Sequence, residues 1–193
     1  MVEGKGSKTW EKAKQFCFTQ PKLAHQLLQK ITRYHYKLFK GSGQKPEQIY
    51  YRYLIVGVDA LSPADFKIFA QPYLLQISDA LKDDAPVILF PKGSWYALKE
   101  LSNSSASGLG VDWCISPQYA RELTGNNITL QGNFDPAKLL LPPSEIKKAV
   151  HEMINAFGAQ NYIANLGHGI TPNIPVDNAK AFVDAVKEYS VKK

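Results

Sequence analysis

The chain has 193 residues, 45% of them apolar and 21% charged, which is typical of a globular domain with a sizeable core. No apolar run reaches the ~18 residues of a membrane span, and the first ten residues lack the apolar core of a signal peptide. The net charge of +6 suits a polyanionic small molecule, whereas the scattered lysines form no basic stripe of the kind that binds nucleic acid.

The two cysteines, Cys17 and Cys114, are far apart and form no CxxC pair, so we expect a reduced, cytoplasmic setting. The sequence contains no Gly-x-Ser-x-Gly elbow, no Walker loop and no His-Glu-x-x-His pair. We therefore predict neither a nucleophilic site nor a metal site. His25 and His35 have no evident partners.

Taken in chain order, the N-terminal half predicts a loop followed by helices that alternate with strands. An apolar face over 21–40 predicts a helix, which the breakers Gly41 to Pro46 end. Ser62-Pro63 begins a second helix, in which Phe66, Phe69, Tyr73, Ile77 and Leu81 share one face. Strands are predicted over 49–56 and 86–90, and a further helix over 95–101.

The C-terminal half continues the same alternation. Strands are predicted over 108–113, 128–135 and 162–166, with helices over 117–124, 144–157 and 176–190. The strand over 162–166 is apolar at almost every position, so we expect it to be buried on both faces. In the last helix, Phe182, Val183 and Val186 are expected to face the core.

Five strands alternating with helices predict parallel βαβ units in an α/β fold. No linker or internal repeat stands out, so residues 1–193 are predicted to form a single domain. Polar residues follow the strands where ligands bind in such folds. They are Arg52, Lys92, Asp112, Asn133, Asp135, Asn165 and His168.

The stretch from Asn161 to Pro175 is the strongest candidate for a binding site. Its strand ends at Gly167-His168-Gly169, where glycine on both sides lets a ligand approach the backbone. Gly132 suggests a similar close approach within Gln131-Gly-Asn-Phe-Asp135. A loop histidine or aspartate that only shapes a turn is the alternative for each of these residues.

Four motifs together resemble the uroporphyrinogen decarboxylase family, because they occur in its order and with its spacing. The closing stretch Pro175 to Ser190 is similar to the family's last helix. The motifs are Met1-Val-Glu-Gly-Lys-Gly-Ser7, Leu109-Gly-Val-Asp-Trp113, Leu130-Gln-Gly-Asn-Phe-Asp-Pro136 and Asn165-Leu-Gly-His-Gly169.

The resemblance implies a partial (β/α)8 TIM barrel, in which the five strands correspond to strands four to eight. It implies cofactor-free removal of carboxyl groups from the acetate side chains of uroporphyrinogen, a tetrapyrrole, giving coproporphyrinogen in heme biosynthesis. The pyrrole-binding aspartate of the family has no counterpart in this sequence. We therefore expect these 193 residues alone to show little or no activity. The family also implies a homo-oligomer, usually a homodimer.

Two substrate-binding residues carry over from the resemblance. His168 matches the family's histidine that contacts a substrate carboxylate. Tyr50 stands where the family's fourth strand carries a phenylalanine, although Arg52 stands where a serine is expected. No catalytic residue is assigned.

Two alternatives remain open. A corrinoid-linked zinc methyltransferase shares the barrel, but zinc activation of a thiol needs thiolate and histidine ligands, and no cysteine follows Cys114. A non-enzymatic half-barrel fragment is the second alternative, and its open strand edges would favour self-association.

The stretch over 33–58 matches the family poorly although both of its flanks match well. A block of differences with sharp edges indicates a local change of reading frame or a sequencing error, with genuine divergence as the alternative. We expect irregular packing over 40–58, and we do not expect Arg52 to hold a carboxylate.

Overall fold

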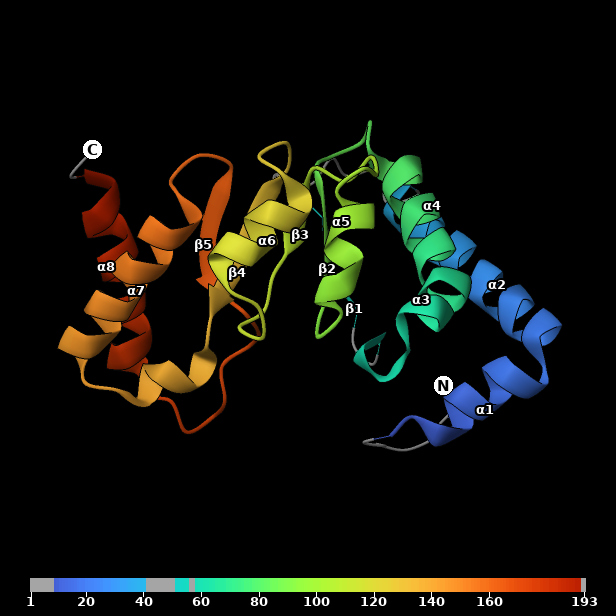
Figure 1. Cartoon of the computed structure of the whole chain (residues 1–193), viewed down its shortest axis with the longest axis horizontal. Helices are drawn as coiled ribbons and strands as arrows, with labels where there is room; N and C mark the ends of the chain where they lie inside the picture. Colours follow the sequence, from blue (N-terminus) through green and yellow to red (C-terminus); the bar gives the residue numbers. More distant parts are fainter. Residues whose placement is uncertain (1–8, 41–50, 56–57, 192–193) are drawn as a thin grey trace. The chain divides into compact units, whose positions relative to one another are not determined.

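The computed structural model describes residues 9–40, 51–55 and 58–191, and its contacts group the chain into two compact units (Figure 1). Unit 1 ends at Gly108 and unit 2 begins at Leu109. Parallel strands alternate with helices in the described part of the chain, which confirms the predicted α/β fold.

Unit 1 contains the first two strands and the helices around them. β1 and β2 pair in parallel, with Tyr51 opposite Val87 and Ile55 opposite Pro91. Its elements are α1 (Glu11–Thr19), α2 (Pro21–Lys40), β1 (Tyr51–Ile55), the 3-10 turn η1 (Val58–Ala60), α3 (Pro63–Phe69), α4 (Gln71–Leu81), β2 (Val87–Pro91), η2 (Trp95–Ala97) and α5 (Leu98–Leu101).

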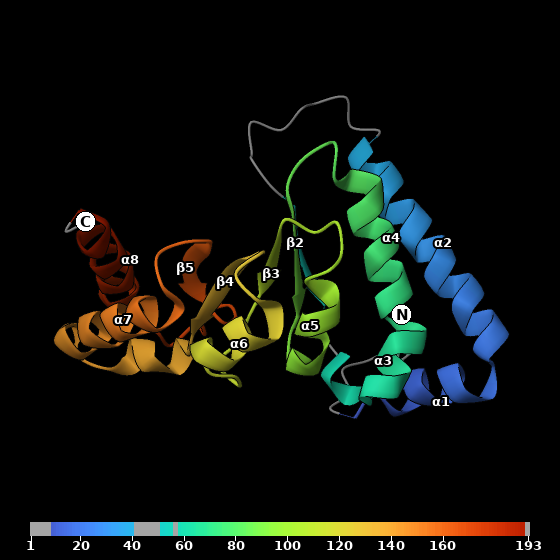
Figure 2. The same cartoon turned by 45° about the horizontal axis from the view of Figure 1, so that its top comes forward.

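Unit 2 contains most of β3 and the strands and helices that follow. β4 and β5 pair in parallel, and the Val111 amide donates to the Gln131 carbonyl at 2.8 Å. α7 and α8 lie side by side (Figures 1 and 2). The elements are β3 (Gly108–Gly110), α6 (Pro117–Thr124), β4 (Thr129–Phe134), η3 (Pro136–Leu140), α7 (Pro143–Phe157), β5 (Tyr162–Leu166) and α8 (Val176–Val191).

The predicted apolar face after Ser62 is confirmed, because all five of its residues are buried. The single helix expected there is wrong, however, since α3 ends at Phe69 and α4 begins at Gln71. Pro72 lies in the first turn of α4 and has no N–H to continue a hydrogen-bond ladder from α3. Ala70 takes φ −124° at the break.

Helix α2 packs against α4, and its apolar face differs in part from the one expected (Figure 2). Ala24 and Thr32 are buried, whereas Leu23 is 52% exposed and Tyr34 70% exposed. At 3.6 residues per turn, Leu23 and Tyr34 lie roughly 80–100° to one side of Ala24, whereas Thr32 lies roughly 80° to the other side. The buried stripe therefore runs through Ala24 toward Thr32, and Leu23 and Tyr34 lie outside it.

Two burial predictions in unit 2 are also wrong. β5 is not buried on both faces, because Ile163 lies 38% exposed. In α8, Val183 is exposed, while Phe182 and Ala185 face the interior. Phe182 packs edge-on against Phe134 of β4 with ring centroids 5.2 Å apart, and that contact sets the rotation of the helix.

Candidate substrate-binding edge

The carboxyl ends of the unit 2 strands meet at one edge, as the sequence predicted. In the register of β4 and β5, Asn133 lies opposite Asn165 and Phe134 opposite Leu166. The Gly167 amide then donates to the Phe134 carbonyl at 2.8 Å, which extends the ladder by one residue. His168 follows directly after this last hydrogen bond.

Gly167 joins the end of β5 to the turn after β3. A Cβ added at Gly167 would lie 2.9 Å from Trp113 Cε3 and 3.1 Å from Asp112 Cα. Contacts this close leave no room for a side chain. The reason for glycine here is therefore the approach of the neighbouring turn, which spacing in the sequence does not reveal.

His168 is half-buried at this edge, and its ring orientation follows from one hydrogen bond. The Gly169 amide lies 2.5 Å from Nδ1 of His168. Because an amide N–H can only donate, Nδ1 accepts, and the neutral ring carries its proton on Nε2. The edge thereby gains an imidazole N–H donor, a group that binds carboxylate oxygens.

The polar residues after β3 and β4 shape the backbone. Asp112 Oδ1 accepts from the Cys114 amide at 2.9 Å, an aspartate turn that ends β3 before Asp112. Asn133 Nδ2 donates to the carbonyls of Asp112 and Ile115 at 3.0 and 2.8 Å. Both side chains are nearly buried. Asn133 therefore ties the end of β4 to the turn that follows β3.

Asn165 and Asp135 also form local bonds. Asn165 Oδ1 accepts from the Leu166 amide at 2.8 Å, and Asp135 Oδ1 accepts from the Ala137 amide at 2.9 Å at the start of η3. Of the predicted polar residues in unit 2, His168 presents the clearest group for a ligand. Sequence reasoning placed these residues at one edge, as the strand register confirms, but did not predict which of them form local turns.

Gly132 permits a close approach, but the group that approaches it is the Val111 carbonyl of the same chain. Its φ is +145°, and an added Cβ would lie 2.1 Å from the Val111 carbonyl oxygen. The Tyr162 hydroxyl donates to the Gly132 carbonyl at 2.5 Å. Burial raises the pKa of the Tyr162 phenol, and the positive Arg121 offsets part of that rise. The phenol therefore remains a donor.

Arg121 anchors the chain that leads into β5. Its guanidinium donates to the carbonyls of Phe157, Gln160 and Asn161 at 3.0 to 3.1 Å. Burial lowers the pKa of this guanidinium, although a guanidinium stays charged at neutral pH. Arg121 thus fixes the start of β5, the strand that presents His168.

A cavity of about 480 Å³ lies behind this edge, between the start of α6, η3 and α7. Sequence reasoning missed it because the lining comes from segments far apart in the chain. Polar and apolar side chains both contribute, among them Cys114, Asn133, Asp135, Lys138, Glu152 and Met153.

Unit 1 carries the other predicted residues. Tyr50 lies outside the described residues, as does most of the expected irregular segment over 40–58. The Arg52 guanidinium carbon stands 4.9 Å from the centroid of the Phe90 ring, so a cation–π contact occupies one face of the group. Burial raises the pKa of Tyr53, on the same strand, to about 12, and Tyr51 adds to the shift.

In 9–40, 51–55 and 58–191, no three His, Cys, Asp or Glu side chains are grouped so that they hold a metal ion. Over the same part of the chain, none of the helices is both long and apolar enough to cross a membrane.

Comparison with known proteins shows which sequences and structures the chain is similar to. A family model described as "Uroporphyrinogen decarboxylase (URO-D)" matches residues 1–189. Uroporphyrinogen decarboxylase from Flavobacterium johnsoniae is 54% identical over 198 residues, covering 97% of this chain and 55% of the relative. The Homo sapiens enzyme of the same name is 36% identical and covers 98% and 54%. The chain thus spans about half the length of the curated relatives it matches.

A solved structure shares the fold. A methyltransferase from Methanosarcina mazei matches with a TM-score of 0.75 and 22% identity, over 93% of this chain and 53% of that one. At this identity the likeness shows the fold alone. It supports the predicted fold class, a partial (β/α)8 TIM barrel.

Proposed function

The chain belongs to the uroporphyrinogen decarboxylase family, and we propose that it supplies the carboxylate-binding part of a site for uroporphyrinogen. The reaction proposed is cofactor-free decarboxylation of the acetate side chains to give coproporphyrinogen. Because the chain spans about half the length of its relatives, the rest of such a site lies outside the matched half. We expect the chain alone to bind the substrate class weakly and to turn it over little or not at all.

The observation that carries this proposal is the position of His168. Its Nδ1 accepts from Gly169 and leaves an Nε2–H donor at the carboxyl end of β5, where parallel α/β folds bind ligands. Arg121 fixes the start of β5, and the contact between Gly167 and Trp113 fixes its end. The donor therefore lies two residues after a strand that is held at both ends.

We assign His168 a role in recognising a substrate carboxylate. In the proposed reaction the substrate's own pyrrole ring takes up electron density, so the protein's work is to orient carboxylates, neutralise their charge and deliver protons. A histidine N–H that meets an acetate oxygen contributes to the first two tasks. Tyr50, outside the described residues, is proposed as a second substrate contact.

We further propose that the protein is cytoplasmic and self-associates. Within the described residues neither Cys17 nor Cys114 forms a disulfide, and such cysteines suit a reducing compartment. Exposed apolar side chains on β5 and α8 support association, because removing apolar surface from water stabilises protein–protein contacts. They are Ile163, Val176 and Val183.

The test is a titration of the full chain with uroporphyrin, the stable octacarboxylate, followed by quenching of tryptophan fluorescence. His168→Ala should weaken binding about 10-fold or more, the effect of losing a hydrogen bond to a charged group. His168→Gln retains a terminal N–H near the Nε2 position and should recover part of the affinity. His35→Ala, which removes an exposed histidine on α2, is the matched control. Equal affinity for His168→Ala and the unmodified chain would remove His168 from the site.

A further inference from the structure

Helix α2 carries an unusual concentration of positive charge. Lys22, Lys30, Arg33, Lys37 and Lys40 lie within it, and it contains no aspartate or glutamate. The sequence between Glu11 and Glu47 contains no acidic residue at all. The overall count of scattered lysines hides this local excess.

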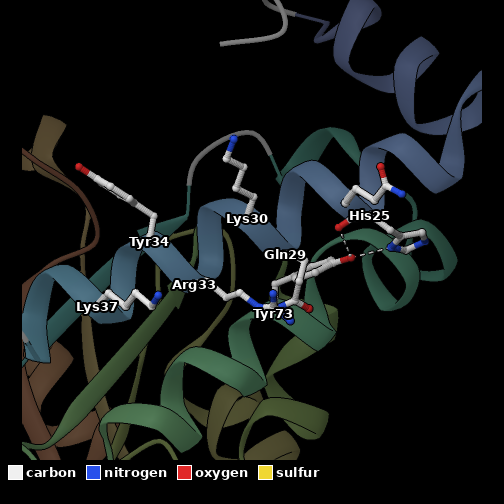
Figure 3. Close-up of a pocket in the computed structure, with 8 residues that line it drawn as sticks. His25, Gln29, Lys30, Arg33, Tyr34, Lys37 and Tyr73 are labelled. Carbon is white, nitrogen blue, oxygen red and sulfur yellow. Dashed lines mark hydrogen bonds between the residues drawn. The ribbon is translucent and has the colours of Figure 1, made fainter.

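Three of these cations border a groove of about 640 Å³ on the surface of α2 and α4 in unit 1 (Figure 3). The lining includes no acidic side chain. Its residues are His25, Gln26, Gln29, Lys30, Arg33, Tyr34, Lys37 and Tyr73.

Hydrogen bonds and ring contacts fix the floor of the groove. His25 Nδ1 lies 2.6 Å from the Tyr73 hydroxyl, and the His25 ring stacks on Phe69 with centroids 5.2 Å apart. The Gln29 amide donates to Gln76 Oε1 at 2.7 Å. Burial raises the pKa of Tyr73, with a smaller contribution from Cys17, so the phenol stays protonated. The expectation that His25 has no partner is therefore wrong.

The cations above this floor are exposed and make no ion pair within the described residues. In Figure 3 the Arg33 side chain extends along the groove toward Gln29 and Tyr73, while Lys30 and Tyr34 project outward. Lys37 follows Arg33 by one helical turn, which places their Cβ atoms about 5–6 Å apart. The two charges thus reach one ligand together.

We propose that this groove binds a small polyanion that carries at least two phosphate or carboxylate groups. Arg33 contacts one anionic group through its planar guanidinium, Lys37 contacts the second, and the polar floor orients the rest of the molecule. The groove lies entirely within unit 1, so this inference does not rest on the proposed function. A long polymer would need a basic track beyond the groove, so the volume favours a small ligand.

The test is isothermal titration of the full chain at about 50 mM salt, where screening of charge is modest. Inorganic triphosphate and citrate are the two ligands, and the tighter one identifies phosphate or carboxylate as the preferred group. The double variant Arg33→Gln with Lys37→Gln should bind about 10-fold or more weakly, as expected for lost charge-assisted hydrogen bonds. Lys12→Gln with Lys22→Gln removes the same charge from exposed positions outside the groove and should retain binding within about twofold.

Arg33→Lys separates a built site from a general charge effect. It keeps the charge but loses the guanidinium fork, so a specific site should weaken by several-fold, whereas a diffuse positive surface should not change. The proposal is overturned if Arg33→Lys binds like the unmodified chain, if the control variant loses as much affinity, or if neither ligand binds. It is also overturned if a short RNA binds through Arg33 more than 10-fold tighter than triphosphate, which would identify a nucleic-acid surface.

Discussion

Gly167 is the residue on which the geometry of the candidate substrate-binding edge depends most directly. We predict that Gly167→Ala destabilises the chain by about 1–3 kcal/mol, the usual effect of forcing a methyl group into a packed site. The methyl group would meet the Trp113 ring and the backbone of Asp112 and Trp113. Urea unfolding monitored by circular dichroism measures the change in the free energy of unfolding.

Gly169 provides the matched control two residues away. A Cβ added there meets no atom within 4 Å, so Gly169→Ala should change the free energy of unfolding by less than about 0.5 kcal/mol. If the two variants unfold at the same urea concentration, the tight contact between Gly167 and the turn after β3 is absent in solution.

Gln131 gives a second prediction at the residue scale. Its side chain is 1% exposed, and neither amide atom has a hydrogen-bond partner within the described residues. Burying an amide without a partner costs about 1–3 kcal/mol. Gln131→Leu should therefore leave stability unchanged or raise it, as measured by thermal unfolding. A clear loss of stability would mean that the amide is hydrogen-bonded in the protein.

The sequence predicts where the polar residues of this edge lie better than it predicts what each of them binds. Gly167 and His168 could be placed at a strand end because the apolar run stops there. The role of Asn133 could not be predicted, because its partners are backbone carbonyls 21 and 18 residues away in the chain. A polar side chain after a strand has the same appearance in the sequence whether it binds a ligand or a carbonyl.

The first residue of a helix can be predicted well from the sequence, because the capping hydrogen bond joins residues that are close in the chain. Ser116 accepts from the Tyr119 amide at 3.2 Å, and α6 begins at Pro117 as predicted. Ser116→Ala should lower the free energy of unfolding by about 1 kcal/mol, while Ser116→Asp should retain the cap. Chemical denaturation compares the two variants. Equal losses for both would show that the Ser116 cap is not formed.

Which helix residues are buried is harder to predict from the sequence, because it depends on which elements cover each face of the helix. The inward face of α4 was predicted correctly, because Tyr73, Ile77 and Leu81 form one apolar stripe. In α8, the sequence does not show whether Val183 or Ala185 turns inward. The packing of Phe182 on Phe134 decides it. α1 was not predicted, because it buries no residue and has no apolar stripe.

At the scale of the whole molecule, the two compact units raise the question of cooperativity. We predict a single unfolding transition, as the single-domain interpretation of residues 1–193 requires. Trp113→Phe leaves fluorescence from Trp10 and Trp95 in unit 1, whereas replacing those two leaves Trp113 in unit 2. Circular dichroism gives the overall urea midpoint of each variant and so measures how much the substitutions change stability. After correction for that change, the fluorescence midpoints of the two variants should coincide. Separate midpoints would establish two independent units.

The central claim is that this chain supplies a competent C-terminal half of a uroporphyrinogen decarboxylase site, with His168 as a substrate contact. It is tested most directly by a chimera that joins residues 1–189 to the N-terminal part of the 54% identical Flavobacterium johnsoniae relative. Anaerobic incubation with uroporphyrinogen, followed by mass spectrometry, counts the carboxyl groups lost.

The account predicts that the chimera forms coproporphyrinogen, that His168→Ala in the chimera slows this about 10-fold or more, and that the 193-residue chain alone shows little or no turnover. A second chimera that takes residues 33–58 from the relative should be faster than the first, because that stretch is where we expect this sequence to depart from the family. Two folded but inactive chimeras, or full turnover by the chain alone, would contradict the account.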